Sequence, residues 1–343
     1  MSLTRPRRRV PDAVRAAIVF AVVLVSGAAT VYFAGQAETD RVVVVTQQAA
    51  AGGQRIVSRL AAPPRTVVTD EQGTVLATFT DGARTAVLKG PTRTFSDPKF
   101  TTATVTTTAW VRLLPEPWAP ESERAPWFDG WLDQTLADTG PDVLAVATDY
   151  LDGAPTRSND DGVPYAGDAA FGPEIGTGKG RLERSDFYDY LGVPWQFPDA
   201  APQTNEAARF RMVDCSGFVR LVYGYRMGIP LRGSNNPGPG LPRRAWAIAE
   251  YGPGTRVIEE REQPATEYDV LQPGDLVFFD IDPQLGPQID HTGIYLGVDS
   301  TGHHRFFSSR AKANGPTIGD LGGTSLLDDG GYYSQSFRTA RRL

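Results

Sequence analysis

The pattern of hydrophobic and polar positions predicts three kinds of segment along this chain of 343 residues. Residues 16–35 form an uninterrupted apolar run without a charge. Short runs between residues 65 and 115 are typical of β-strands, and several later runs have the spacing of one helix face. We therefore expect an N-terminal apolar segment, a small β-rich region and a mixed domain of helices and strands.

The apolar run at residues 16–35 has about the twenty residues that a helix needs to cross a bilayer. Residues 1–15 contain five arginines and one acidic residue, which predicts a cytoplasmic leader with the body of the chain outside the membrane. We assign residues 16–36 as a transmembrane anchor and residues 37–64 as a stalk, so the expected location is the cell membrane. A cleavable secretory signal ending near Gly35-Gln36-Ala37, which would release a secreted protein, is the alternative.

Residues 65–125 are expected to form a small β-rich module. Strand-like runs at residues 66–69 and 74–79 flank Asp70-Glu71-Gln72-Gly73, which is a hairpin turn signal. Further strands are predicted at residues 86–88 and 101–111. No residue of this module indicates chemistry, so we expect a structural or spacer role, with wall binding or autoregulation as the alternative.

The remaining segment, residues 126–343, is expected to be an α+β domain. Helical spacing occurs at residues 142–151, 218–223 and 242–249, and strand-like runs occur at residues 276–279 and 291–297. Long loops and inserts separate these elements.

Cys215 is the only cysteine of the chain and lies in Asp214-Cys215-Ser216-Gly217, just before the apolar run at residues 218–223. This position predicts a thiol at the start of a helix, where backbone N–H groups favour the thiolate, the form that attacks. A small buried core cysteine is the alternative. All three histidines, His291, His303 and His304, follow it within fourteen residues of one another. A histidine at the start of the predicted strand 291–297 would supply the base that a cysteine nucleophile requires.

Three segments in this order resemble the signature blocks of the NlpC and p-sixty family of papain-like cysteine hydrolases. They are residues 214–219 (Asp-Cys-Ser-Gly-Phe-Val), residues 271–279 and residues 291–297. The resemblance covers roughly residues 140 to 320. It implies a fold with helices packed on an antiparallel sheet, and Cys215 and His291 as the catalytic pair.

The resemblance also implies further site residues. Ser308 aligns best with the third catalytic position, and His303 and His304 are alternatives. Tyr165, in a Pro-Tyr-x-x-Gly-like stretch, would lie beside the nucleophile. Asp214 and Ser216 would shape the acyl pocket and contact the substrate.

Charge and residue types exclude several other classes of function. The net charge of −6 combines a basic leader with a body carrying 29 basic and 39 acidic residues, which argues against nucleic-acid binding. Paired ligand motifs for zinc are absent, so neither a metal nor another cofactor is expected. Arg243 and Arg244 are expected on a solvated face, with contact to an acidic peptide as the alternative.

These observations lead to one expected mechanism. His291 takes the proton of Cys215, the thiolate attacks an amide carbonyl, and water releases the acyl group from a thioester. By resemblance the substrate is the stem peptide of peptidoglycan, often at the D-glutamyl–diaminopimelate bond. The alternatives are a catalytically degenerate wall-binding or scaffolding protein, and an amidase or acyltransferase that acts on another extracellular substrate.

Overall fold

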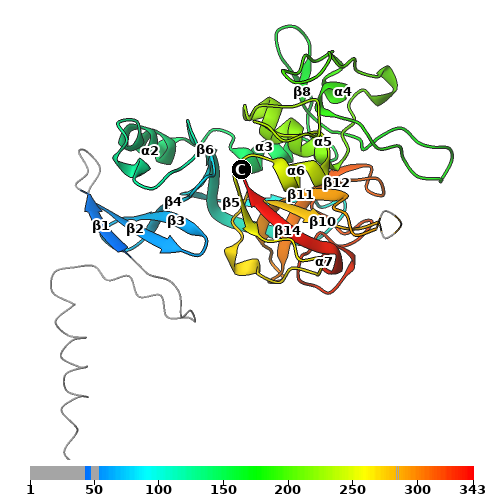
Figure 1. The fold of residues 1–343 in the computed structure, drawn as a ribbon. Helices are drawn as coiled ribbons and strands as arrows, with labels where there is room; N and C mark the ends of the chain where they lie inside the picture. Colours follow the sequence, from blue (N-terminus) through cyan, green and yellow to red (C-terminus); the bar gives the residue numbers. More distant parts are fainter. Residues whose placement is uncertain (1–42, 48–53, 283, 285) are drawn as a thin grey trace, which may run out of the picture.

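Two antiparallel six-stranded sheets lie next to each other in the computed structural model, which describes residues 43–47, 54–282, 284 and 286–343 (Figure 1). The first sheet follows chain order and contains β1 (Val43–Gln47), β2 (Arg55–Ala61), β3 (Pro64–Thr69), β4 (Val75–Thr80), β5 (Thr85–Ser96) and β6 (Thr104–Leu113). The expected anchor at residues 16–36 and the leader at residues 1–15 lie outside the described residues. Within the described part, no helix is both long and apolar enough to cross a membrane.

The first sheet begins earlier than the sequence suggests. β2 pairs with β3 throughout its length, so residues 55–61 belong to the sheet and not to a stalk. β3 and β4 form a hairpin across the turn at residues 70–74. The Asp70 carboxylate accepts hydrogen bonds from the backbone of Gln72 and Thr74, and Gly73 has the positive φ of 78° that this turn requires.

A helix covers one face of this sheet and closes a separate hydrophobic cluster. It is α2 (Phe128–Ala137), which follows the short η1 (Ser122–Arg124). Phe79 of β4 stacks on Trp118 at 4.2 Å between ring centroids, and Phe128 and Leu132 of α2 complete the cluster. All four side chains are at most 1% exposed.

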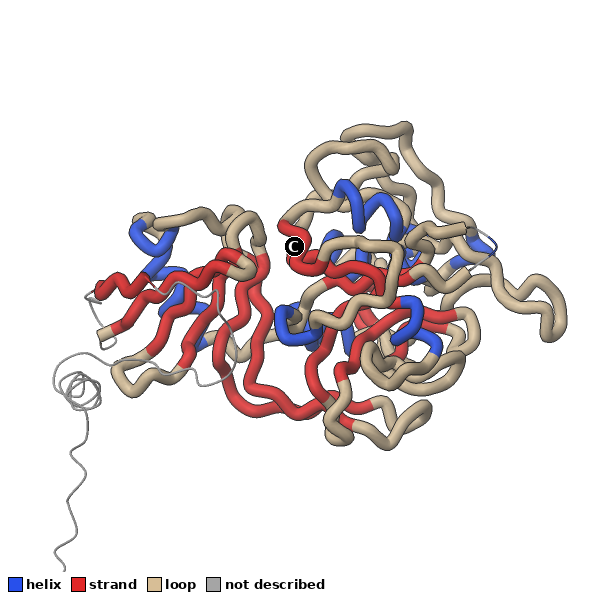
Figure 2. Tube along the Cα trace, turned by 60° about the horizontal axis from the view of Figure 1, so that its bottom comes forward, coloured by secondary structure: helices blue, strands red, loops and turns tan. Residues whose placement is uncertain are grey.

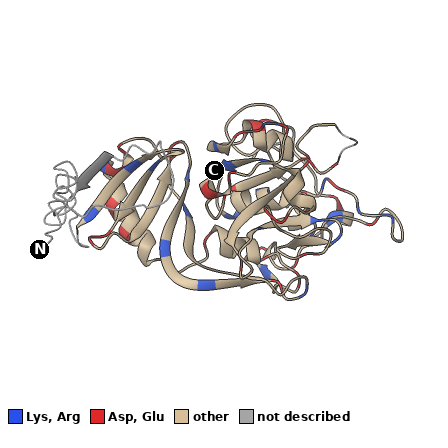
Figure 3. Ribbon diagram, turned by 90° about the horizontal axis from the view of Figure 1, so that it is seen from below, with Lys and Arg blue, Asp and Glu red and all other residues tan. Residues whose placement is uncertain are grey.

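β5 and β6 reach beyond the first sheet and form a long curved hairpin between the two halves of the molecule (Figures 2 and 3). The register of the hairpin shifts between Lys89 and Arg93. Beyond the shift, Phe95 and Val105 are buried in the core of the second half, together with Val111. The hairpin therefore contributes to both cores.

The second sheet has the strand order β13-β12-β11-β10-β14-β9. Its strands are β9 (Thr255–Ile258), β10 (Leu276–Phe279), β11 (His291–Val298), β12 (His304–Arg310), β13 (Gly315–Thr317) and β14 (Phe337–Arg342). Successive residues of β10 face opposite cores, as expected for a strand buried on both sides: Leu276 and Phe278 join one cluster, and Val277 and Phe279 join the other.

Helices cover one face of the second sheet, which confirms the expected packing of helices on an antiparallel sheet. They are α3 (Val143–Thr148), α5 (Cys215–Val219), which continues as the π-helix η3 (Arg220–Arg226), and α6 (Ala245–Tyr251). The short α7 (Tyr332–Ser336) supplies Tyr333 to the cluster on the other face. The smaller elements are β7 (Arg157–Ser158), β8 (Pro164–Ala166), α4 (Phe187–Leu191), η2 (Ala207–Arg209) and η4 (Tyr268–Val270).

Polar contacts at the end of β14 join the two sheets. The Arg342 guanidinium donates to both oxygens of Asp275 at 2.8 Å and to the Thr80 hydroxyl of β4 at 2.5 Å. The Thr85 backbone N–H donates to the Leu343 carbonyl at 2.6 Å. Arg342 and Asp275 are each about 1% exposed, so this connection lies inside the protein.

Candidate active site

Cys215 is the first residue of α5, as the sequence predicts. Asp214 caps this helix, because its carboxylate accepts the Gly217 backbone N–H at 2.7 Å. Gly217 also allows the helix to approach the segment before α4: a Cβ at this position would lie 2.3 Å from the Ser185 carbonyl oxygen. The segment Asp-Cys-Ser-Gly thus places the thiol at the start of a helix that Asp214 caps and that packs closely against Ser185.

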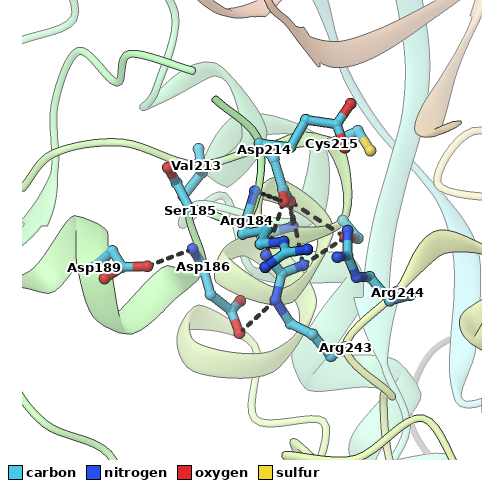
Figure 4. A network of polar contacts seen from close by, with 12 residues as sticks. Arg184, Ser185, Asp186, Asp189, Val213, Asp214, Cys215, Arg243 and Arg244 are labelled. Carbon is cyan, nitrogen blue, oxygen red and sulfur yellow. Dashed lines mark hydrogen bonds and ion pairs between the residues drawn. The ribbon is translucent and has the colours of Figure 1, made fainter. Parts of the chain in front are cut away.

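A buried network of ion pairs surrounds Asp214 (Figure 4). Arg243 donates to Asp214 at 2.8 Å and to Asp186 at 3.3 Å, and it also donates to the Ser216 hydroxyl at 2.7 Å. Burial by itself would raise the pKa of Asp214, but Arg243 and backbone hydrogen bonds from Gly217 and Arg184 outweigh it and hold that pKa below its ordinary value. Asp214 is therefore a buried, ionised carboxylate.

This network corrects three expectations. Arg243 neither lies on a solvated face nor points to an acidic ligand, because two buried aspartates already hold its guanidinium. Asp214 and Ser216 are each 2% exposed and are engaged with Arg243, so they hold the start of α5 and do not line a substrate pocket. Figure 4 shows the Asp214 carboxylate directed into the arginines, whereas the Cys215 sulfur lies outside this network.

The thiol lies against the start of β11, where His291 is the first residue. The Cys215 Sγ atom is 3.9 Å from the carbonyl oxygen of Asp290. The Asp290 carboxylate in turn accepts the backbone N–H groups of Ile281 and Asp282 at 2.9 and 2.7 Å, which fixes the turn that precedes the histidine. The structure thus brings the Cys215 helix and the His291 strand together, as the spacing of the motifs predicts.

The surroundings of this pair favour the neutral form of both members. Burial, together with the negative charges of Asp214 and Glu183, raises the pKa of the Cys215 thiol. Burial and the positive charge of Arg310 lower the pKa of His291 to about 3. The expected preference for a thiolate at the helix start is therefore outweighed by desolvation and by neighbouring carboxylates.

Ser308 lies on β12, on the strand that neighbours His291. Ile294 pairs with Phe307 across β11 and β12, and Ser308 follows directly in this register. Ser308 is fully buried, and its hydroxyl accepts a hydrogen bond from Arg310 Nε at 2.8 Å. His291 Nε2 is buried and has no hydrogen-bond partner among the described residues. Ser308 is thus in the expected strand position but hydrogen-bonds to Arg310 and not to the imidazole.

The other two histidines lie far from this position. Val298, at the far end of β11, pairs with His304, so His304 is about 23 Å along the strand from His291 at 3.3 Å per residue. The His304 ring contacts the Tyr295 hydroxyl through Nδ1 at 2.7 Å, and His303 contacts Asp328 at 3.2 Å. These distances remove His303 and His304 as candidates for the third catalytic residue.

Tyr165 is also distant from the nucleophile. Its carbonyl accepts a hydrogen bond from Arg226, and the Arg226 guanidinium lies 5.0 Å from its ring centroid. Cys215 and Arg226 are the two ends of the continuous segment α5–η3, so they are roughly 15 Å apart at about 1.5 Å per residue. Tyr165 therefore lies at the C-terminal end of α5–η3, whereas Cys215 lies at its N-terminal end. The prediction that Tyr165 lies beside Cys215 is wrong.

A pocket of about 540 Å³ opens next to the imidazole. Its walls include His291, Phe171, Glu183 and Arg310, together with Tyr332 and Tyr333 of α7. Apart from His291, sequence reasoning missed these residues. The only signal was the position of Arg310, two residues after Ser308 on a strand, which places both side chains on one face.

Among the described residues, no group of three or more His, Cys, Asp or Glu side chains could hold a metal ion. The site presents a thiol at Cys215, an imidazole at His291 and a buried guanidinium at Arg310.

Comparison with known proteins gives the class of the site-bearing region. Residues 192–325 match the model of the NlpC/P60 family, which confirms the resemblance indicated by the three motifs. One solved structure, a lipoprotein-like protein of the NLP/P60 family from Staphylococcus aureus, is 20% identical, with a TM-score of 0.26. The match covers 63% of this chain and 48% of that structure, so this chain spans about half the length of that protein. No curated protein matches the chain.

Proposed function

We propose that this protein is a cysteine peptidase or amidase of the cell wall that hydrolyses an amide bond in peptidoglycan stem peptides. The match of residues 192–325 to the NlpC/P60 family supports a cell-wall peptidase-like function in general. The observation that carries the finer proposal is that the Cys215 thiol lies at a helix start and against the residue that precedes His291, and that His291 lines a pocket.

In the proposed reaction, Cys215 and His291 are both neutral before the substrate binds. A neutral imidazole at His291 accepts the thiol proton as the substrate carbonyl approaches, and the Cys215 sulfur forms a bond to the carbonyl carbon. The backbone N–H of Cys215, at the start of the helix, donates to the resulting oxyanion. His291 then gives its proton to the leaving amine as the C–N bond breaks. Water hydrolyses the thioester, with His291 again as the base.

Desolvation makes the first proton transfer the difficult step of this sequence. It raises the pKa of the donor and lowers the pKa of the acceptor, so the ion pair of thiolate and imidazolium is unfavourable in the empty site. A bound substrate that offers compensating charge or hydrogen bonds near the imidazole would reduce this penalty.

The test compares the full chain, purified in detergent, with its Cys215→Ala variant on isolated peptidoglycan. Released fragments are identified by mass spectrometry. The proposal requires fragments with new peptide ends from the wild type alone, and those ends identify the bond. Equal release by the variant, or none by either protein while folding is intact, would contradict it.

A second candidate function is supported by the surroundings of His291. Because Ser308 hydrogen-bonds to Arg310, no described residue orients the imidazole through Nε2. A wall-binding protein with a degenerate catalytic pair would have this arrangement. It would sediment with peptidoglycan as well in the Cys215→Ala form as in the wild type, and neither form would release fragments.

We further propose that residues 16–35 anchor the chain, with residues 43–343 outside the cytoplasmic membrane. The apolar length and the arginines before it support this location. Extraction of membranes at alkaline pH separates the two alternatives, because an uncleaved anchor remains in the pellet whereas a cleaved, secreted form is found in the medium.

A further inference from the structure

Arg310 is a buried cation without an acidic partner. It is 3% exposed, and no carboxylate among the described residues lies within ion-pair distance of its guanidinium. All its hydrogen-bond acceptors are neutral: the Ser308 hydroxyl at 2.8 Å, the carbonyls of Gly319 at 3.3 Å and Gly323 at 2.6 Å, and the Ser325 hydroxyl. Asp320 and Asp97 act on this guanidinium only from beyond ion-pair distance, and burial outweighs their effect, so the pKa of Arg310 is lowered.

Arg310 and His291 line the same pocket. Arg310 lines this pocket of about 540 Å³, and its guanidinium lies 4.4 Å from the ring centroid of Tyr333, which lines it too. Lys312, two residues further along, is exposed at the same pocket. Among the described residues that line this pocket, Glu183 is the single acidic one. The part of the wall that carries Arg310 and Lys312 is therefore positive. His291, whose buried Nε2 has no hydrogen-bond partner among the described residues, lines the same pocket.

We propose that this pocket binds a carboxylate group of the substrate, held by the Arg310 guanidinium and the Lys312 ammonium. Arginine and carboxylate form strong charge-assisted hydrogen bonds when water is excluded, and a bound carboxylate would supply the direct ion pair that Arg310 lacks. The inference rests on the proposed function for the identity of the substrate: a peptide that carries a free carboxylate close to the amide bond that is cleaved.

A bound carboxylate would also act on the catalytic base. The positive charge of Arg310 disfavours the imidazolium form of His291, and an anion beside the guanidinium would offset this effect. Arg310 would thus select carboxylate-bearing peptides twice, once in binding and once in the proton transfer that follows. A purely structural Arg310 would only hold the segment 319–325 through its neutral acceptors.

Two probe peptides separate these roles. One is L-alanyl-γ-D-glutamyl-meso-diaminopimelate, and the other is the same tripeptide with its carboxylates converted to carboxamides. Binding to the full chain carrying Cys215→Ala is measured by isothermal titration calorimetry, so the result does not depend on turnover. The matched control is Lys179→Gln, a lysine exposed on the Gly-rich turn and outside the pocket.

The proposal requires the carboxylate peptide to bind at least about tenfold more tightly than the carboxamide peptide. Arg310→Gln should abolish this preference and Lys312→Gln should reduce it, whereas Lys179→Gln should leave it unchanged. If Arg310→Gln does not fold, the binding preference of Lys312→Gln provides the test, since the Lys312 side chain is exposed and its replacement should leave the fold intact. Equal affinity for both peptides, absence of binding, or an unchanged preference in the folded Arg310 and Lys312 variants would overturn the inference.

Failure of the proposed function gives a different result. A carboxylate preference in binding, combined with no hydrolysis by the wild type, would contradict the peptidase proposal and leave this inference intact. Equal hydrolysis of both peptides by the wild type would contradict this inference and leave the peptidase proposal intact.

Discussion

Replacement of Arg243 by methionine tests the ion network under the nucleophile. The substitution keeps the side chain long and removes the guanidinium that contacts Asp214 at 2.8 Å and Asp186 at 3.3 Å. An exposed ion pair would contribute at most about 1 kcal/mol. Here the Asp214 side chain is 3% exposed and that of Arg243 is 14% exposed, so little solvent is available to screen the Asp214 carboxylate once its cation is lost. Asp186 keeps its buried ion pair with Arg220 at 3.0 Å. We therefore expect a loss of about 3–5 kcal/mol in the free energy of unfolding.

The pH dependence of this loss has a defined sign. In the wild type the pKa of Asp214 is lowered, so its contribution to stability is present above its unfolded pKa of about 3.9 and is lost as the pH falls through the lower folded value. In Arg243→Met burial prevails and the folded pKa rises above the unfolded one. The deficit relative to the wild type should therefore shrink as the pH is lowered through that raised pKa.

Urea unfolding followed by tryptophan fluorescence measures both effects, and Arg244→Met is the matched control. The Arg244 side chain makes no hydrogen bond or ion pair within the part of the chain that the structure describes, so its loss should change stability by less than about 0.5 kcal/mol. Adding Asp214→Asn to Arg243→Met should recover part of the lost stability. Equal unfolding midpoints for the two arginine variants would refute the reasoning.

Three further predictions concern the pair and the first core. Cys215 should react slowly with iodoacetamide at pH 7 and faster only as the pH rises above 9. Glu183→Gln should speed the reaction at a given pH, because it removes a negative charge that raises the pKa of the thiol. A reaction rate that is already maximal below pH 7 would contradict this prediction. The pKa of His291 falls from 6.5 to about 3 on folding, so between these pH values the unfolded chain binds more protons than the folded chain. The free energy of unfolding should therefore decrease by up to about 1.4 kcal/mol for each pH unit by which the pH is lowered in this range. His291→Gln should remove this slope in acid-unfolding curves. Trp118→Ala should lower the free energy of unfolding by about 3–5 kcal/mol, because the ring is 1% exposed and stacks on Phe79. If denaturant unfolding gives a free energy within about 1 kcal/mol of the wild type, the first core tolerates the cavity and the prediction is wrong.

The catalytic pair could be predicted from the sequence because each member is specified locally. Asp214 before an apolar run signals a helix start that places Cys215 at its first position, and His291 opens an apolar run of strand length. The antiparallel sheet with helices on it follows from the same short segments. These elements depend on neighbours in sequence, which is what periodicity and capping report.

The surroundings of the pair could not be predicted, because they depend on contacts between distant segments. Arg310 would be taken for a solvated strand end, and only the loop that contributes Gly319, Gly323 and Ser325 buries it. Tyr165 was placed by its motif, yet 49 intervening positions allowed the chain to take it to the far end of the helix. Desolvation of the thiol likewise arises from three-dimensional packing, so helix position alone gave the wrong sign for its pKa.

The curved β5–β6 hairpin sets where this protein can be divided. The family match begins at residue 192, and a fragment cut there would lack Phe95, Val105 and Val111 from the core beneath the active site. A fragment ending at residue 325 would also lose β14, which lies between β10 and β9 in the second sheet. The region shared by sequence similarity is thus smaller than the unit that folds. Expression of the matched region alone should yield an insoluble or molten product, whereas a fragment that starts at residue 54 retains the strands that complete both cores.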